Sequence, residues 1–489
     1  MYTKLKTIIT KNNILKDYIS FSFWSTVGTV VSKLTLMLIW VMIARLLKPE
    51  IYGEFSLIKN TSYLFSEFIG LSLSIAATKF VAELSNDNLS LQKIINTLLV
   101  ACTILGVTIS VIFFSLSDFI AINMAKKSDL SQYISITSIV VLFSTINNCQ
   151  IGILKGLLKF RLIVRLNFLQ VVLSFPFFYY GTKYIGLLGA VWAYVFHYMV
   201  ITAITQLHIR KHCNKNIIKI NYKIDRIILK KIITYVLPYF AALLISYFAS
   251  WYNEIILVSS SDSGFRQMGI YSAVSSIQSM IISGILVLCG PLVAMMSKYK
   301  KNSDFLDKLN YYIPFFLVMM LILPLLLIPE VIGLVYGTDY KGDGVYNLMW
   351  IITLYTPFIV IRHAIGRSVA VYEKQNIYLL DNILMGVIAV GGFISYSSYG
   401  IIAMVTAVGI ANLLSILIFT PIYIKIKLLS HNIFNLKYMG IAMLLLLSVG
   451  SIYIILKDNF AIRITILITI YLILSLLIIR RFKSYLKNA

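Results

Sequence analysis

Carboxylates are scarce in this sequence, and so are charges of either sign. Only 13% of its 489 residues are charged, with 19 Asp and Glu against 43 Lys and Arg, whereas 59% are hydrophobic. A water-soluble domain cannot bury so large an apolar share, and the apolar segments are too long for membrane-spanning strands. These features predict an all-α polytopic membrane protein.

Cysteines and catalytic motifs are also rare. The four cysteines show no CxxC spacing, so the sequence predicts neither a disulfide framework nor a metal site. His208, His212 and Cys213 have ligand-like spacing in a basic loop, but no further Cys or His lies nearby in the sequence. A Walker A loop, a GxSxG motif and a DxD motif on a sizeable loop are missing, which excludes an ATPase and a typical glycosyltransferase. We therefore expect a protein that is not an enzyme and that holds no cofactor.

Long apolar runs make up most of the chain. Fourteen predicted spans lie at about 21–44, 55–81, 94–116, 133–154, 163–182, 185–207, 233–258, 268–296, 310–335, 346–371, 377–396, 401–424, 438–456 and 462–479. Lys and Arg number 30 in the tails and loops on the side of the termini, but 9 in the loops on the opposite side. The positive-inside rule then places both termini in the cytoplasm. The net charge of +24 reflects these basic loops, so it does not indicate a nucleic-acid partner.

An internal repeat divides the first twelve spans into two halves. Tyr52–Ser56 resembles Met268–Ser272 at an offset of 216 residues, and Gly186–Ala193 resembles Gly400–Ala407 at an offset of 214. Six spans is an even number, so the halves share one orientation and are related by an axis along the membrane normal. The predicted units are an N-terminal six-helix lobe (1–209), a basic cytoplasmic linker (210–231), a C-terminal six-helix lobe (232–424), and two additional helices with a basic tail (425–489).

Three charged residues lie within the first two spans, where hydrocarbon is expected. Lys33 is near the middle of the first span, and Lys59 and Glu67 lie in the second. A charge at the bilayer centre costs about 2.5–3.5 kcal/mol on insertion scales, so such residues usually face a water-filled cavity or a partner. The helical rise places Lys33 and Glu67 at similar depth, roughly 18 and 21 Å from the outer end, and Lys59 at roughly 9 Å.

We predict that the two lysines line a cavity for a negatively charged substrate. The alternative is that they form ion pairs with Glu67 or Glu54 that only hold the helices together. Glu67 either pairs with Lys33 or titrates as part of H⁺ or Na⁺ coupling.

Charges in the second half extend this hypothesis. Arg362, in the tenth span, either faces the cavity or extends to the interface. Glu254, near the outer end of the seventh span, and Arg266, in the following loop, either form an outer gate pair or are ordinary interfacial charges in an aromatic belt. Asp381, early in the eleventh span, is expected at the interface.

The opening of the chain resembles that of the polysaccharide-biosynthesis flippases. Ala44–Ser56, which follows a basic tail and a long first span, is similar to the start of the O-antigen and capsule flippases of the multidrug/oligosaccharidyl-lipid/polysaccharide (MOP) exporter superfamily. The Gly152–Phe160 loop and the Gly186–Ala193 motif also resemble that family, as do twelve core spans followed by two more.

This resemblance implies a MATE-like fold and a flippase of the bacterial inner membrane. Its cargo would be an undecaprenyl-pyrophosphate-linked oligosaccharide repeat unit, moved by alternating access and driven by a gradient of H⁺ or Na⁺. Family members carry cationic residues in a central cavity, and Lys33, Lys59 and Arg362 would fill that role here. The implied partners are the lipid-linked oligosaccharide, the bilayer and other polysaccharide-assembly membrane proteins.

Three rival functions stay open. A lipid II flippase has the same chemistry with a different cargo. A multidrug exporter of the same superfamily needs an acidic cavity for cationic drugs, and the mostly basic charges within the spans argue against it. A membrane polymerase or ligase usually carries a long periplasmic loop, whereas the longest outer loop here, around Ser117–Gln132, is short.

Overall fold

The computed structural model shows a bundle of helices that follow the predicted spans. It describes residues 13–84, 87–215, 221, 224–298, 303–372, 374–426, 428–429, 446, 448–456 and 459–470. Nine helices within these residues are long and apolar enough to cross a membrane, judged by length and composition. The protein is therefore a multi-pass membrane protein built from helices.

The first half of the chain forms the N-lobe, helices α2 to α6. Its elements are α2 (Asn13–Glu83), α3 (Asn88–Asp118), the π-helix η1 (Phe119–Met124), α4 (Leu130–Gly156), α5 (Phe160–Ile185) and α6 (Leu187–Lys215). The two first predicted spans both belong to α2, which bends back at Lys48, where φ is 62°, just before Pro49. Proline disfavours a helical conformation in the preceding residue and donates no backbone hydrogen bond, which explains the kink.

The kink end of the bundle is the end at which α2 bends back, around Lys48–Gly53. The linker end is the opposite end, where the chain passes from α6 to α7.

The second half forms the C-lobe, helices α7 to α13. Its elements are α7 (Arg226–Ser259), α8 (Gly264–Lys298), α9 (Ser303–Leu327), α10 (Val331–Tyr336), the 3₁₀ turn η3 (Thr338–Tyr340), α11 (Asp343–Tyr372), α12 (Gln375–Ser395), the 3₁₀ turn η4 (Ser397–Tyr399) and α13 (Gly400–Lys425). The ninth predicted span, 310–335, is wrong at its end: α9 stops at Leu327 and the short α10 follows Pro329, which cannot continue the helical hydrogen bonding. The last two predicted spans lie partly outside the described residues.

Short polar side chains fix where two of the helices begin. Asp87 accepts hydrogen bonds from the backbone N–H groups of Leu89 and Ser90 at the start of α3. Asp225 does the same for Ile227 and Ile228 at the start of α7. Each carboxylate satisfies N–H groups that have no partner within the helix, so these caps set the entry points of one helix in each lobe.

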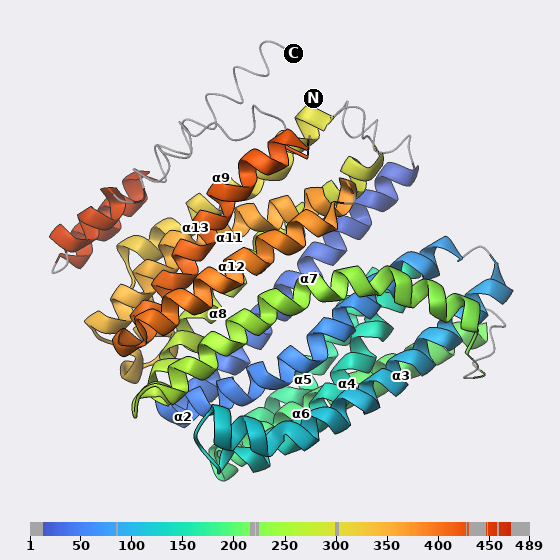
Figure 1. The fold of residues 1–489 in the computed structure, drawn as a ribbon, viewed down its shortest axis with the longest axis horizontal. Coiled ribbons are helices and arrows are strands. Elements are labelled where there is room, and N and C mark those ends of the chain that lie inside the picture. Colours follow the sequence, from blue (N-terminus) through green and yellow to red (C-terminus); the bar gives the residue numbers. More distant parts are fainter. Residues whose placement is uncertain are drawn as a thin grey trace.

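Helix α2 joins the two lobes. Within the N-lobe it packs against α4 and α5, and across the boundary it packs against α7 and α8. In Figure 1, the first half of α2 runs between the two groups of helices. The largest apolar cluster contains residues of both lobes, among them Phe55, Trp251 and Tyr340. The boundary between the lobes is therefore a packed interface at least in part.

The structure supports the internal repeat. Gly186 and Gly400, which the repeat makes equivalent, begin the last helix of each lobe with nearly the same backbone conformation (φ 66°, ψ −136° and φ 59°, ψ −136°). A positive φ of this kind favours glycine, which explains why both positions are glycine. The residue limits of the predicted units stay predictions.

Candidate functional site

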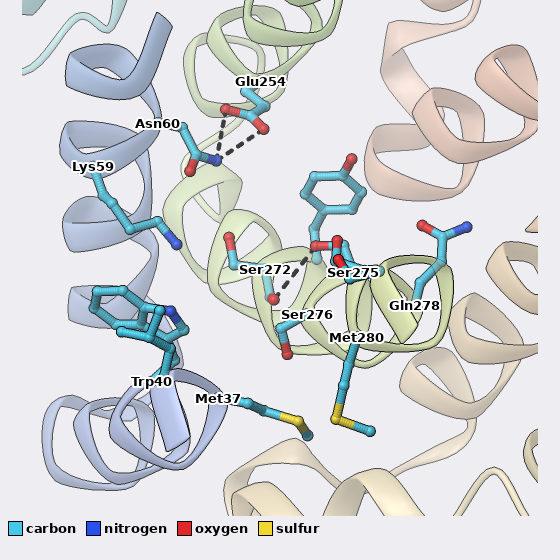
Figure 2. A pocket seen from close by; sticks show the side chains of 14 residues that line it. Met37, Trp40, Lys59, Asn60, Glu254, Ser272, Ser275, Ser276, Gln278 and Met280 are labelled. Atoms are coloured by element: carbon cyan, nitrogen blue, oxygen red, sulfur yellow. Dashed lines mark hydrogen bonds between the residues drawn. The ribbon is translucent and has the colours of Figure 1, made fainter. Parts of the chain in front are cut away.

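A polar cavity lies between the two lobes. Its volume is about 350 Å³, and its walls come from both halves of α2, from α7 and from α8. Figure 2 shows the side chains that line it. Because α2 belongs to one lobe and α7 and α8 to the other, any movement of the lobes changes the shape of this cavity.

Lys59, in the second predicted span, contributes a cation to the wall of the cavity. Its Nζ lies 4.8 Å from the centre of the Trp40 ring, on the other arm of α2 (Figure 2). An aromatic face stabilises an ammonium group without neutralising it. Within the described part of the chain, Lys59 makes no ion pair. The alternative pairing with Glu54 is not formed, since Glu54 binds Lys127 at 2.5 Å instead.

Glu254 supplies a carboxylate on the facing helix, α7. It is only 8% exposed. Asn60, next to Lys59 on α2, donates from Nδ2 to both carboxylate oxygens, at 3.0 and 3.1 Å. Trp251, one turn earlier on α7, donates from its ring nitrogen to Thr61 Oγ1 at 3.0 Å. These bonds cross the lobe boundary, so the cavity wall near Glu254 is also a link between the lobes.

The α8 wall of the cavity is a row of hydroxyl groups. Serines recur at positions that share one helix face, and they line the cavity from its Glu254 side toward the linker end: Ser272, Ser275, Ser276, Ser279 and Ser283. Ser276 hydrogen-bonds to the hydroxyl of Tyr336. The Oγ atom of Ser272 is buried and has no partner among the described residues. A cation, a carboxylate and a row of hydroxyls therefore meet in one cavity.

Arg362 lies in a second cavity, inside the C-lobe. Its Nη2 donates to Asn382 Oδ1 at 2.7 Å and lies 3.4 Å from Asp381 Oδ1. Asp381 is 1% exposed and also accepts hydrogen bonds from Ser415 and, at 2.8 Å, from Tyr423. Asp381 was expected at the membrane interface; the structure shows that it is not exposed, because a buried guanidinium and two hydroxyls hold its carboxylate inside the lobe.

The two cavities share part of their walls. Tyr271 and Gln278, both on α8, line the inter-lobe cavity and the C-lobe cavity. Lys59 and Arg362 therefore line neighbouring cavities that share a wall, and the prediction that they act on one substrate stays a prediction.

Lys33, Glu67 and Arg266 were also predicted as site residues. Lys33 and Glu67 lie within α2, but their side chains are outside the described part of the structure. Arg266 is exposed near the start of α8. The predicted gate pair of Glu254 and Arg266 is not formed among the described residues, because Glu254 turns into the cavity and binds Asn60.

The kink end of the lobe boundary is tightly closed. A Cβ atom on Gly53 would collide with the backbone carbonyl of Phe265, and one on Gly269 would collide with that of Pro49. Arg45 donates from Nε to the Val335 carbonyl at 2.9 Å and from Nη2 to the Leu334 carbonyl at 2.8 Å. Gly53 and Gly269 are equivalent positions of the repeat, so the two lobes meet through matching segments.

Sequence reasoning missed several residues of the site. Trp40 and Asn60 are an aromatic and an amide in apolar runs, and nothing in their spacing separates them from ordinary packing residues. The serine row does carry a signal, since its members are 3, 4, 7 and 11 residues after Ser272. A stripe of small residues is also typical of close helix packing, so the sequence alone does not distinguish a cavity wall from a helix–helix contact.

Comparison with solved structures shows which folds this one resembles. An inward-facing multidrug resistance MATE family transporter of the MOP superfamily matches with a TM-score of 0.67 at 16% identity, covering 81% of this chain and 94% of that one. A MOP superfamily transporter from Pyrococcus furiosus, described as having a binding pocket of reversed polarity, matches with a TM-score of 0.63 at 16% identity, covering 84% and 95%. The outward-facing form of a MATE transporter matches with a TM-score of 0.64 at 16% identity, covering 84% and 95%. No curated protein sequence matches the chain.

These likenesses define a helical membrane protein with the two-lobed fold of MOP-superfamily transporters. Residues 21–300, more than half of the chain, match the family model described as polysaccharide biosynthesis protein. The chain belongs to that polysaccharide biosynthesis family.

Proposed function

We propose that the protein is a flippase for polyprenyl-pyrophosphate-linked oligosaccharides, which it moves from the cytoplasmic to the outer leaflet of the bacterial inner membrane by alternating access. Lys59 is the observation that carries this proposal. Its ammonium lies in a cavity between the lobes, against Trp40 and with no ion pair among the described residues. A cation in that setting attracts a phosphate group, and lysine binds phosphate as a point charge.

The cavity also suits the sugar end of such a cargo. Its α8 wall offers serine hydroxyls that can exchange hydrogen bonds with sugar hydroxyls. The isoprenoid tail needs no polar site, since it can stay in lipid while the headgroup crosses. Membership of the polysaccharide biosynthesis family supports a sugar-bearing cargo, and O-antigen or capsule units are the classes we propose.

The closed kink end supports alternating access. With the termini in the cytoplasm, the kink end is the outer end, and the close contact of Gly53 with Gly269 seals it. The cargo would then enter from the cytoplasmic side, and separation of the lobes at the kink end would release it outside. We propose a gradient of H⁺ or Na⁺ as the energy source, with Glu254 as the group in the cavity that can carry the coupling ion.

The test is flipping of a pyrophosphate-linked oligosaccharide lipid in proteoliposomes. We expect Lys59→Ala to lower the initial rate about ten- to a hundredfold, because a hydrogen bond to a charged group contributes about 1.5–3 kcal/mol. Lys425→Ala, which removes an exposed lysine at the end of α13, is the matched control and should transport normally.

Three outcomes separate the candidate functions. Wild-type flipping that Lys59→Ala retains would remove Lys59 from the headgroup site. Equal or faster flipping of lipid II would change the cargo. Absence of flipping together with extrusion of a cationic dye that Glu254→Gln abolishes would favour a multidrug exporter, the second candidate, because Glu254 is a carboxylate in the same cavity.

A further inference from the structure

An apolar groove lies on the surface of the N-lobe, between α5 and α6. Its volume is about 690 Å³. The aromatic rings of Phe177 and Tyr180 on α5 and of Trp192 on α6 line it, and all three side chains are exposed. Both helices are long and apolar enough to cross a membrane, so the groove opens into the lipid bilayer. Neither cavity of the candidate site includes any of these residues.

Two glycines form the floor of the groove. A Cβ atom on Gly181 of α5 would lie 2.8 Å from the carbonyl oxygen of Gly189 on α6, and one on Gly189 would collide with the carbonyl of Gly181. The two backbones therefore touch where the helices cross, and both glycines line the groove. In its wall, Phe177 and Phe196 stack across the helices with ring centroids 3.8 Å apart. A trough with a bare backbone floor and aromatic walls accepts a thin apolar chain.

The groove is about as long as one leaflet of the bilayer is deep. Its lining runs from Pro176 to Ile185 on α5 and from Gly189 to Met199 on α6. At a rise of about 1.5 Å per residue, these stretches are about 14 and 15 Å long. One leaflet provides about half of the roughly 30 Å hydrocarbon core, or about 15 Å. A single acyl chain can therefore lie along the whole groove.

The groove is separated from the inter-lobe cavity. Trp40, which lines that cavity, packs against Phe178 on α5 and Tyr194 on α6, with ring centroids 5.7 and 6.2 Å away. Both of these residues are buried, whereas Phe177, the neighbour of Phe178, lies in the groove. A cargo whose headgroup binds Lys59 cannot place its tail in the groove, because this layer of packed rings lies between them. The groove therefore fits a lipid other than the bound cargo.

A cation lies at the mouth of the groove, at the kink end. The α5–α6 turn belongs to that end, because Phe178 near the end of α5 packs on Trp40, about two turns before the kink of α2. Lys183 is in the last turn of α5, and its Nζ lies 5.5 and 5.6 Å from the ring centres of Tyr179 and Tyr184, the second of which lines the groove. The Lys183 side chain is exposed and makes no ion pair with a described residue. Its charge is therefore available to the phosphate of a lipid headgroup.

The internal repeat indicates that these side chains are not needed for the fold of a lobe. At the offset of 214 residues, the position of Lys183 is occupied in the C-lobe by Ser397, and that of Trp192 by Thr406. The helices there still pair, α12 with α13, as α5 pairs with α6. A lobe can thus form the same helix pair without the cation and the indole, so a binding role accounts for them better than a structural one.

We propose that this groove is a binding site for an anionic phospholipid, with one acyl chain in the groove and the phosphate against Lys183. A zwitterionic headgroup brings its own cation, whereas an anionic headgroup has a net charge that Lys183 balances. In the predicted orientation the kink end faces outward, so the lipid belongs to the outer leaflet. The site goes beyond the proposed flippase function and does not depend on it, because it recognises a lipid of the surrounding membrane and not the cargo.

The test is quenching of tryptophan fluorescence by brominated lipids. The full-length protein is reconstituted in phosphatidylcholine vesicles that contain rising fractions of phosphatidylglycerol or phosphatidylcholine with brominated acyl chains. Trp192 lines the groove, and its signal is the difference between the wild type and Trp192→Phe, since the chain has five tryptophans. We expect half of this signal to be quenched at an about fivefold lower fraction of brominated phosphatidylglycerol than of brominated phosphatidylcholine, the effect of one basic group near a membrane surface.

Two lysine variants decide what causes the preference. Lys183→Gln should abolish it and leave quenching by brominated phosphatidylcholine unchanged. Lys341→Gln, which removes an exposed lysine of the C-lobe at the same end, should retain it. Equal quenching by the two lipids in the wild type, or a preference that Lys183→Gln retains, would overturn the site.

The same measurement identifies other occupants. If a polyprenyl phosphate displaces brominated phosphatidylglycerol at a lower concentration than unbrominated phosphatidylglycerol does, the groove holds an isoprenoid tail and the phospholipid assignment is wrong. If neither lipid quenches Trp192 and the protein elutes as a dimer in size exclusion, a second copy of the chain covers the groove. Quenching in proportion to the lipid fraction, with no saturation, would mean that only bulk lipid lies there.

Discussion

Arg463 is a buried cation outside both cavities. It is 2% exposed, and its Nη2 lies 2.7 Å from Glu330 Oε1 while its Nη1 donates to the Leu327 carbonyl at 2.9 Å. The ring of Tyr453 is 5.1 Å from the guanidinium carbon. Arg463 therefore ties a segment that follows the two six-helix lobes to the end of α9.

We expect Arg463→Ala to destabilise the protein strongly. The substitution removes a large, fully buried side chain together with its hydrogen bond to the Leu327 carbonyl and its contact with Tyr453, and such truncations cost about 3–5 kcal/mol. Thermal unfolding in detergent would show this as a clear fall in Tm. Glu330→Gln should also cost several kcal/mol, since it leaves the charge of Arg463, whose side chain is only 2% exposed, without its counter-ion. A Tm for Arg463→Ala within the range of the exposed control Arg266→Ala would show that the pair is not structural.

A charged residue within a membrane-spanning run could be predicted to need a polar environment, because burying its charge in lipid is energetically costly. Lys59 was found from sequence because a charge within an apolar run needs a polar environment, whatever its neighbours are. The surroundings of Arg362 could not be found in this way. They combine α11, α12 and α13, and the partner of a buried charge depends on which helices pack together, which hydropathy does not encode.

At the scale of helices, the contact of α2 with α8 depends on having no side chain at two positions. Gly53 and Gly269 face each other's backbone so closely that a Cβ on either would collide with a carbonyl oxygen. Gly284, further along α8, has nothing within 4 Å of the position of a Cβ. The same substitution can therefore be compared at a packed and at an open glycine.

We expect Gly53→Ala to lower the free energy of unfolding by about 1–3 kcal/mol, because the added methyl group forces α2 and α8 apart. Gly284→Ala should instead stabilise by about 0.5–1 kcal/mol, since alanine loses less backbone entropy in a helix. Chemical or thermal unfolding in detergent measures both. Similar effects of the two substitutions would mean that the close contact at Gly53 does not exist in the protein.

Most of the helices could be predicted, because a membrane-spanning helix requires a long apolar run and such a run is visible in the sequence. The kink of α2 was visible as a polar, proline-containing turn. The end of α9 was not, since Pro324 lies inside that helix while Pro329 follows its end. A proline is tolerated in a membrane helix when neighbours satisfy the released carbonyl, so sequence alone does not say which proline ends the helix.

At the scale of the whole molecule, the described residues join the two lobes at the kink end through a few polar contacts in addition to the packing of Gly53 and Gly269. Arg45 on α2 donates two hydrogen bonds to backbone carbonyls of α10. The hydroxyl of Tyr340 donates to the Ala44 carbonyl at 3.3 Å, and Lys126 donates from Nζ to the Ser259 carbonyl at 3.1 Å. Each such bond contributes about 0.5–1.5 kcal/mol. Polar bonds of this size add to the packing of α2 against α8, and the loss of any one of them shifts the balance between closed and open forms by a measurable amount.

Arg45→Ala should therefore shift the molecule toward opening at the kink end. Loss of its two hydrogen bonds, about 1–2 kcal/mol together, corresponds to a roughly five- to thirtyfold change in the ratio of open to closed forms.

A cysteine placed at Ser275, on the cavity wall, reports this opening through labelling by a membrane-impermeant maleimide added on the outer side. The native cysteines Cys102, Cys149, Cys213 and Cys289 are all buried, which keeps the background low. Labelling should be slow in Ser275→Cys alone, faster after Arg45→Ala, and unchanged after Arg266→Ala, which removes an exposed arginine of α8 at the same end. Fast labelling before Arg45 is changed, or faster labelling only from the linker side, would mean that the kink end is not the closed outer gate and that the direction of access runs the other way.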